Sequence, residues 1–186
     1  MQNPIIVALD VPSTQKALKL AEELASVVGA FKVGKQLFVS GGPDVVRKLR
    51  GLGAKIFIDL KFHDIPNTVA KAVQSATDLG VDMLTVHASG GSEMLGAAES
   101  AGHEQAAMLR SEPPLILGVT VLTSMDDANL AELGIDESVQ DRVLRLAKLA
   151  AGAGLRGLVC SPQEISLIRG ELGDGIHLVT PGIRPE

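Results

Sequence analysis

Short apolar, largely β-branched runs alternate with longer stretches of helical period along all 186 residues. The runs expected to form strands are residues 4–10, 31–34, 56–61, 83–87, 115–122, 157–160 and 177–180. The stretches expected to form helices are about 13–28, 44–52, 67–79, 93–109, 139–153 and 163–169. Nearly continuous apolar strands separated by helices are typical of parallel strands covered by helices and joined by right-handed crossovers.

Seven strands with helices between them favour the α/β class and a (β/α)8 TIM barrel, formed as a single domain over residues 1–186. A barrel of ordinary size has about 200 residues or more. We therefore expect the eighth strand and its flanking helices to be missing after Glu186. The same alternation also permits a doubly wound open sheet, although no G-x-G-x-x-G motif follows the first strand.

Composition argues against several classes of protein. The net charge of -5 comes without a basic block, which argues against nucleic-acid binding. No signal-peptide pattern opens the chain, and no apolar run approaches the roughly 20 residues that cross a bilayer. The only cysteine, Cys160, cannot form an internal disulfide and is expected to be a core residue rather than a nucleophile. A cytoplasmic protein without a membrane partner is predicted.

Polar or turn-forming residues stand at the C-terminal end of every expected strand. They are Asp10, Lys32, Asp59 with Lys61, His87, Thr123, Ser161, and Pro181 with Arg184. In a parallel barrel these ends converge on one mouth, where barrel enzymes place their chemistry.

Asp59 and Lys61 are two residues apart, so in a regular strand they share a face. Because a buried ion pair without further partners is costly, Lys32 and Asp64 are expected to complete an alternating Lys-Asp-Lys-Asp array. Simpler interpretations remain: Asp64 could cap the following helix, Lys32 could be a solvated strand-end lysine, and Asp59 with Lys61 could be a structural ion pair.

Asp59, Asp64, His63 and His87 could also suggest a divalent metal site, but Lys61 would compete for the carboxylates. The residues therefore do not favour a metal site.

Residues 59–68 (DLKFHDIPNT) resemble D-x-K-x-x-D-I-P-x-T, the signature of the bacterial orotidine 5′-monophosphate decarboxylase family. Residues 8–10 (ALD), 31–34 (FKVG), 86–91 (VHASGG), 120–124 (TVLTS) and 180–185 (TPGIRP) also resemble that family, so the similarity covers the whole chain. The shorter D-x-K-x-x-D pattern is shared with sugar-phosphate decarboxylases and synthases, whereas the IPNT and GIRP segments favour the nucleotide enzyme.

The resemblance implies decarboxylation of orotidine 5′-monophosphate to uridine 5′-monophosphate without a cofactor, the last step of de novo UMP biosynthesis. It implies that Lys61 protonates C6, that Asp59 lies against the substrate carboxylate, and that Lys32 and Asp64 complete the catalytic network. These four residues would also contact the substrate, together with Asp10 at the ribose, Ile65, Thr68, Thr123 at the pyrimidine, and Pro181 and Arg184 at the base and phosphate. In this family the second aspartate and the following threonine reach into the neighbouring subunit's site, so Asp64 and Thr68 imply a homodimer.

The family's other phosphate-binding residues, a glutamine and a Gly-Arg pair, would lie beyond Glu186, which leaves Arg184 as the one expected phosphate cation. Two alternatives follow. One is a catalytically silent, truncated barrel that binds a nucleotide, and the other is a metal-dependent sugar-phosphate decarboxylase of the same superfamily.

Overall fold

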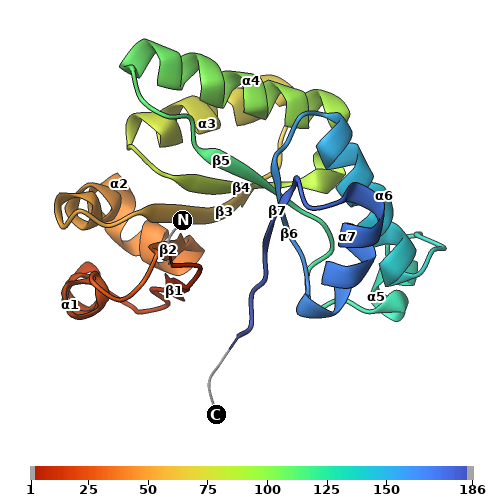
Figure 1. Cartoon of the computed structure of the whole chain (residues 1–186), viewed down its shortest axis with the longest axis horizontal. Helices are drawn as coiled ribbons and strands as arrows, with labels where there is room; N and C mark the ends of the chain where they lie inside the picture. The colour runs from red at the N-terminus through yellow and green to blue at the C-terminus, as the bar shows by residue number, and fades with distance from the viewer. Residues whose placement is uncertain (1–2, 184–186) are drawn as a thin grey trace. The chain divides into compact units, whose positions relative to one another are not determined.

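The computed structural model describes residues 3–183, in which strands and helices alternate along the chain (Figure 1). The strands are β1 (Ile6–Ala8), β2 (Ala30–Gly34), β3 (Ile56–Phe62), β4 (Met83–His87), β5 (Leu115–Val119), β6 (Gly157–Val159) and β7 (His177–Val179). The α-helices are α1 (Thr14–Leu24), α2 (Lys35–Gly51), α3 (Pro66–Asp78), α4 (Gly91–Leu109), α5 (Asp127–Glu132), α6 (Val139–Gly152) and α7 (Ile165–Leu172). Two short 3-10 helices, η1 (Ala88–Gly90) and η2 (Pro162–Glu164), precede α4 and α7.

The strands form one sheet in chain order, from β1 to β7. The pairings of β1 with β2, β2 with β3, β5 with β6, and β6 with β7 are parallel. A sheet in chain order with a helix after each of the first six strands has the α/β topology of a (β/α)8 barrel, of which the described residues supply seven strands. The predicted fold class is confirmed, and all seven predicted strands are present.

Two helical segments differ from the prediction. The helix expected at 44–52 belongs to α2, which begins at Lys35 and is kinked at Gly42 (φ 59°, ψ -165°) just before Pro43. The first half of this helix was not predicted, because a Gly-Pro pair is more typical of the start of a helix than of a kink within one. Helix α5 was not predicted, because six residues with one buried side chain, Leu130, give too short a periodic signal.

The chain divides into two compact units, each made of three segments. The first comprises Met1–Leu60, Lys71–Leu84 and Ala101–Pro114, and the second comprises Lys61–Ala70, Thr85–Ser100 and Leu115–Glu186. In the first unit α1 packs beside α2, and the fully buried side chains include Phe31, Leu37, Leu49, Ile56 and Ile58. The Asp82 carboxylate accepts hydrogen bonds from the Ile56 N–H (2.8 Å) and the Arg50 guanidinium (3.2 Å), which fixes the start of β3.

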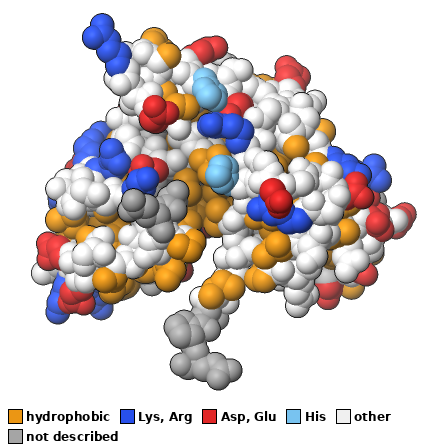
Figure 2. All heavy atoms as spheres, viewed as in Figure 1, with side chains coloured by type: hydrophobic (Ala, Val, Ile, Leu, Met, Phe, Trp, Pro, Cys, Tyr) orange, Lys and Arg blue, Asp and Glu red, His pale blue; other side chains and the backbone are white. Residues whose placement is uncertain are grey.

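In the second unit α6 packs beside α7 (Figure 1), and Leu95, Leu117, Leu158 and Ile168 are fully buried. Gly157 is required by close packing, because a Cβ there would lie 2.5 Å from Leu117 Cδ2. Acidic and basic side chains are interspersed on the face shown in Figure 2. Over residues 3–183, every helix is too short or too polar to cross a membrane.

Candidate active site

Three charged side chains meet within the first unit: Lys32 and Asp59 lie in the middle of β2 and β3, and Asp10 lies two residues after the end of β1. Lys32 Nζ lies 3.4 Å from Asp10 Oδ1 and 3.6 Å from Asp59 Oδ2. The side chains of Lys32 and Asp59 are 22% and 16% exposed, whereas that of Asp10 is 68% exposed. One half-buried ammonium group therefore joins a sheltered carboxylate to one that faces solvent.

Strand register brings these three residues together. In the parallel pairings Lys32 is the partner of Ala8, two residues before Asp10, and Asp59 is the partner of Gly34. The Leu9 N–H continues the ladder by donating to the Lys32 carbonyl at 2.9 Å. This arrangement agrees with the rule that the carboxyl ends of parallel strands lie at one edge of a sheet.

Gly34 leaves room for this cluster. A Cβ at this position would lie 3.3 Å from Asp10 Oδ1, which is tighter than most Cβ contacts, and 3.4 Å from Lys32 Nζ, which is ordinary contact. Its φ of -86° is open to any residue, so the glycine is needed for space and not for backbone conformation.

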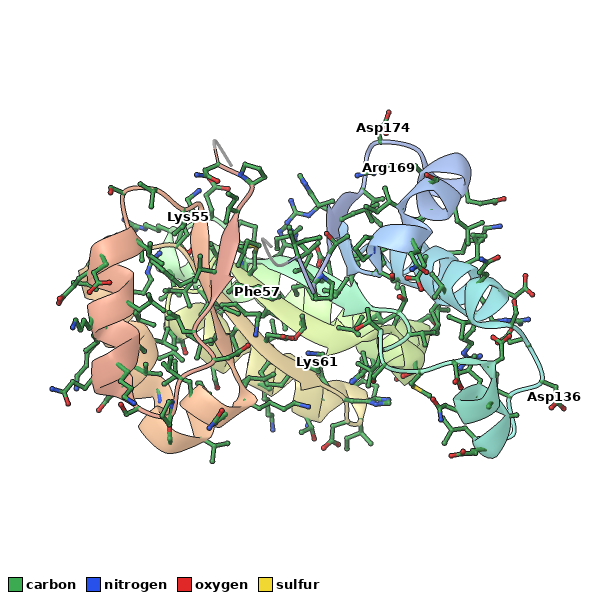
Figure 3. The ribbon with its side chains drawn as sticks, turned by 90° about the horizontal axis from the view of Figure 1, so that it is seen from below. Lys55, Phe57, Lys61, Asp136, Arg169 and Asp174 are labelled. Atoms are coloured by element: carbon green, nitrogen blue, oxygen red, sulfur yellow. The ribbon has the colours of Figure 1, made fainter. Side chains whose placement is uncertain are left out.

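Lys61 begins the second unit and has an unusual backbone. Its φ is 56°, and among the described residues only Lys61 and Arg110 have a positive φ without being glycine. The left-handed conformation costs a residue with a Cβ about 1–2 kcal/mol, and residues held in such conformations cluster at functional sites. The Lys61 N–H donates a hydrogen bond to Thr85 Oγ1 at 2.9 Å. Figure 3 labels Lys61 near the C-terminal end of β3.

The backbone at Lys61 departs from the regular strand on which the predicted shared face of Asp59 and Lys61 was based, and the shared face itself stays a prediction. A shared face for Asp59 and Lys61 was predicted from the two-residue alternation of a regular strand, and that alternation is interrupted at Lys61. Ile58 is buried as expected, but Leu60 is only half-buried. The positive φ could not be predicted from the local sequence, because lysine in a strand normally adopts an extended conformation.

The segment between β3 and α3 carries three more predicted residues: Asp64, Ile65 and Thr68. Asp64 Oδ1 accepts a hydrogen bond from the Ile65 N–H at 2.7 Å. The Ile65 carbonyl accepts from the N–H groups of Thr68 (3.0 Å) and Val69 (3.2 Å), which opens the first turn of α3. Asp64, Ile65 and Thr68 are all exposed, so their side chains are accessible to a ligand or another chain.

The other predicted residues follow later strands. Thr123 lies after β5 and Pro181 after β7, and both are exposed. Arg184 lies outside the described residues. The His63 and His87 rings are 5.3 Å apart between centroids. Within residues 3–183 no group of three or more His, Cys, Asp or Glu side chains could hold a metal ion.

Polar residues after β6 have structural partners. Ser161 Oγ accepts from the Gln163 N–H, and the Glu164 carboxylate accepts from the Ser161 N–H at 2.8 Å, which together cap η2. Burial raises the pKa of the Glu164 carboxyl despite this hydrogen bond. Cys160 is fully buried, and burial raises the pKa of its thiol to about 11, in agreement with the predicted core role.

Sequence reasoning missed Gly34 and Thr85 as site residues. Gly34 was quoted only as part of the FKVG segment, although a glycine directly after a strand-end lysine is a signal of close approach. Thr85 is a hydroxyl residue in the otherwise apolar MLTV run before His87. A buried hydroxyl requires a hydrogen-bond partner, which could have drawn attention to it.

Comparison with known proteins gives a consistent result. A family model described as "Orotidine 5'-phosphate decarboxylase / HUMPS family" matches residues 3–186. The orotidine 5′-phosphate decarboxylase of Syntrophotalea carbinolica is 53% identical over 181 residues, which is 97% of this chain and 74% of that protein. The Vibrio cholerae enzyme of the same name is 50% identical over 186 residues, which is 100% of this chain and 79% of that protein.

Solved structures agree with these sequence matches. The crystal structure of orotidine 5′-phosphate decarboxylase from Lactobacillus acidophilus is similar with a TM-score of 0.86 and 39% identity, covering 98% of this chain and 82% of that one. The crystal structure of an uncharacterized conserved protein from Geobacillus kaustophilus is similar with a TM-score of 0.90 and 37% identity, covering 96% of this chain and 83% of that one. The chain belongs to the orotidine 5′-phosphate decarboxylase / HUMPS family.

Proposed function

We propose that this chain decarboxylates orotidine 5′-monophosphate to uridine 5′-monophosphate without a cofactor, as the last step of de novo UMP biosynthesis. Relatives that are 53% and 50% identical to this chain over nearly its whole length are named for this activity. The observation that carries the proposal is the ion-paired cluster of Asp10, Lys32 and Asp59, which the first three strands bring together. Charged groups held in place by the strands of a barrel can stabilise the negative charge that develops in this reaction.

The reaction breaks the bond between C6 of the pyrimidine and its carboxylate carbon, and CO2 departs. The electron pair remains on C6 as a carbanion without a conventional electron sink, so fixed positive charge must stabilise it. In the proposal, the Lys61 ammonium group provides that charge and then transfers a proton to C6. Lys61 recovers its proton from solvent after the product leaves.

The other residues take supporting roles in the proposal. Asp59 lies against the substrate carboxylate, and repulsion between the two is relieved as CO2 leaves. Lys32 and Asp64 complete the charged network, and Asp10 binds the ribose hydroxyls. Thr123, Ile65 and Pro181 contact the base, and Arg184 binds the phosphate. Energy from phosphate binding positions the ring for reaction.

A homodimer is part of the proposal, with Asp64 and Thr68 of each subunit contributed to the other subunit's site. The exposure of Asp64, Ile65 and Thr68 at the entry to α3 supports this assignment. The protein is proposed to act in the cytoplasm, where pyrimidine nucleotides are made.

The test follows the loss of ultraviolet absorbance of orotidine 5′-monophosphate, with and without a chelator. Turnover that is unchanged by the chelator supports the proposal. A folded protein without turnover supports the silent nucleotide-binding alternative, and activity only on sugar phosphates with added magnesium supports the metal-dependent alternative. Size-exclusion chromatography with light scattering measures the dimer.

Lys61→Ala tests the proton donor. Loss of both proton transfer and charge stabilisation should lower kcat by at least about 10³-fold while the protein stays folded. Lys71→Ala is the matched control, because Lys71 is an exposed lysine on α3. A Lys61→Ala rate close to that of the wild type would remove Lys61 from the donor role.

A further inference from the structure

The buried hydroxyl group of Thr85, in the second unit, differs from the other buried hydroxyl groups in its hydrogen bonding. Among the described residues, the buried polar or charged side chains are Thr77, Thr85 and Thr120. Thr77 Oγ1 donates to the Val73 carbonyl at 2.9 Å, and Thr120 Oγ1 donates to the Val159 carbonyl at 3.2 Å. Thr85 Oγ1, by contrast, accepts a hydrogen bond from a backbone N–H, that of Lys61.

We propose that Thr85 is a positioning residue for Lys61: its buried hydroxyl holds the Lys61 backbone in the left-handed conformation that directs the ammonium group to the reacting carbon. The inference rests on the proposed function, because it assumes that Lys61 is the proton donor. It adds a residue of β4 that the family motif does not contain.

The backbone of Lys61 requires such a partner. Lys61, with a φ of 56°, departs from the extended geometry of its strand, and its N–H donates to a side-chain hydroxyl, that of Thr85. A backbone N–H that is partly shielded from water costs free energy without an acceptor, and the Thr85 hydroxyl, 2.9 Å away, provides one. Thr85 itself is 1% exposed on β4, so it offers a fixed position.

The conformation matters for chemistry because φ at Lys61 sets the direction in which its side chain leaves the backbone. If Lys61 relaxed to an extended φ, its Cβ would return to the regular alternation of the strand and the ammonium group would move with it. A shift of about 1 Å in a catalytic group can lower a rate by roughly 10²-fold. Loss of the hydroxyl should therefore reduce catalysis without removing any group that touches the substrate.

The test compares Thr85→Val, which keeps the shape but removes the acceptor, with Thr85→Ser, which keeps the acceptor. Thr85→Val should lower kcat for orotidine 5′-monophosphate by about 10²-fold and change KM by less than about threefold, and Thr85→Ser should restore kcat to within about threefold. Thr77→Val is the matched control: it removes a buried hydroxyl bonded to a helix carbonyl, so it should lower the melting temperature and leave kcat unchanged.

A purely structural role for Thr85 predicts a different pattern, in which kcat per folded enzyme is normal in Thr85→Val. That result overturns the inference. If Thr85→Val does not fold, Thr85→Cys takes its place, because a thiol of similar size is a weak acceptor and should give an intermediate kcat.

A second readout separates failure of the inference from failure of the proposed function. Wild-type protein without turnover contradicts the proposed function alone. A crystal structure of Thr85→Val then tests the inference without activity. A negative φ at Lys61 supports it, and a positive φ in the absence of the hydroxyl overturns it.

Discussion

The backbone strain at Lys61 can be measured by comparing Lys61→Ala with Lys61→Gly. Both substitutions remove the same side-chain functional group, so effects of the lost ammonium group cancel in the comparison. They differ in backbone preference: alanine at a φ of 56° keeps the strain, and glycine adopts this conformation freely.

The expected magnitude follows from two opposing effects. The left-handed conformation costs a residue with a Cβ about 1–2 kcal/mol. Glycine loses more conformational entropy on folding, which costs about 0.5–1 kcal/mol relative to alanine. The glycine variant should therefore be more stable than the alanine variant by about 0.5–1 kcal/mol. For a chain of this length that is a melting temperature higher by about 1–4 °C.

The assay is urea unfolding of both variants at a fixed protein concentration, since the stability of the proposed dimer would depend on concentration. Lys71, in the middle of α3, provides the control pair. At this position the glycine variant should be less stable than the alanine variant by about 1 kcal/mol, because a helical residue has no left-handed strain that glycine could relieve. The sign of the glycine-alanine difference should thus reverse between positions 61 and 71.

The reasoning is refuted if glycine is as destabilising at position 61 as it is at position 71. If the reversal is observed, the wild-type protein tolerates strain at a residue whose proposed role is catalytic. This is the expected trade between stability and activity at a functional site.

Three further predictions concern other residues. Gly34→Ala places a Cβ against Asp10 and Lys32, so kcat/KM should fall by about tenfold with cooperative unfolding retained; an unchanged kcat/KM would contradict the proposed crowding. Burial raises the folded-state pKa of Glu164, so the stability linked to its protonated form is fully present below the unfolded pKa and is lost as pH rises through the folded pKa. Glu164→Gln keeps an oxygen acceptor, and urea unfolding should show it gaining stability relative to wild type from pH 4 to pH 7; a relative loss would oppose this account. Cys160, with a pKa of about 11, should react with a thiol reagent far more slowly in the native protein than in denaturant, and equal rates would show that the thiol is accessible.

The sequence by itself determined the succession of the seven strands along the chain and the charged residues that they carry. Apolar runs and helical periods report which segments are buried, and strand direction decides that Lys32 and Asp59 stand at the same edge. The family signature at residues 59–68 added the expected chemistry, which periodicity alone could not provide.

Only the tertiary structure decided how individual groups are held. Asp10, which lies outside the predicted array, is a second ion-pair partner of Lys32 beside Asp59, because register places the end of β1 there. The left-handed conformation of Lys61 opposes local preference and is accompanied by a hydrogen bond to Thr85, a residue 24 positions away. Sequence patterns record local preference and average burial, so a conformation that depends on a distant hydroxyl emerges only when the strands are assembled.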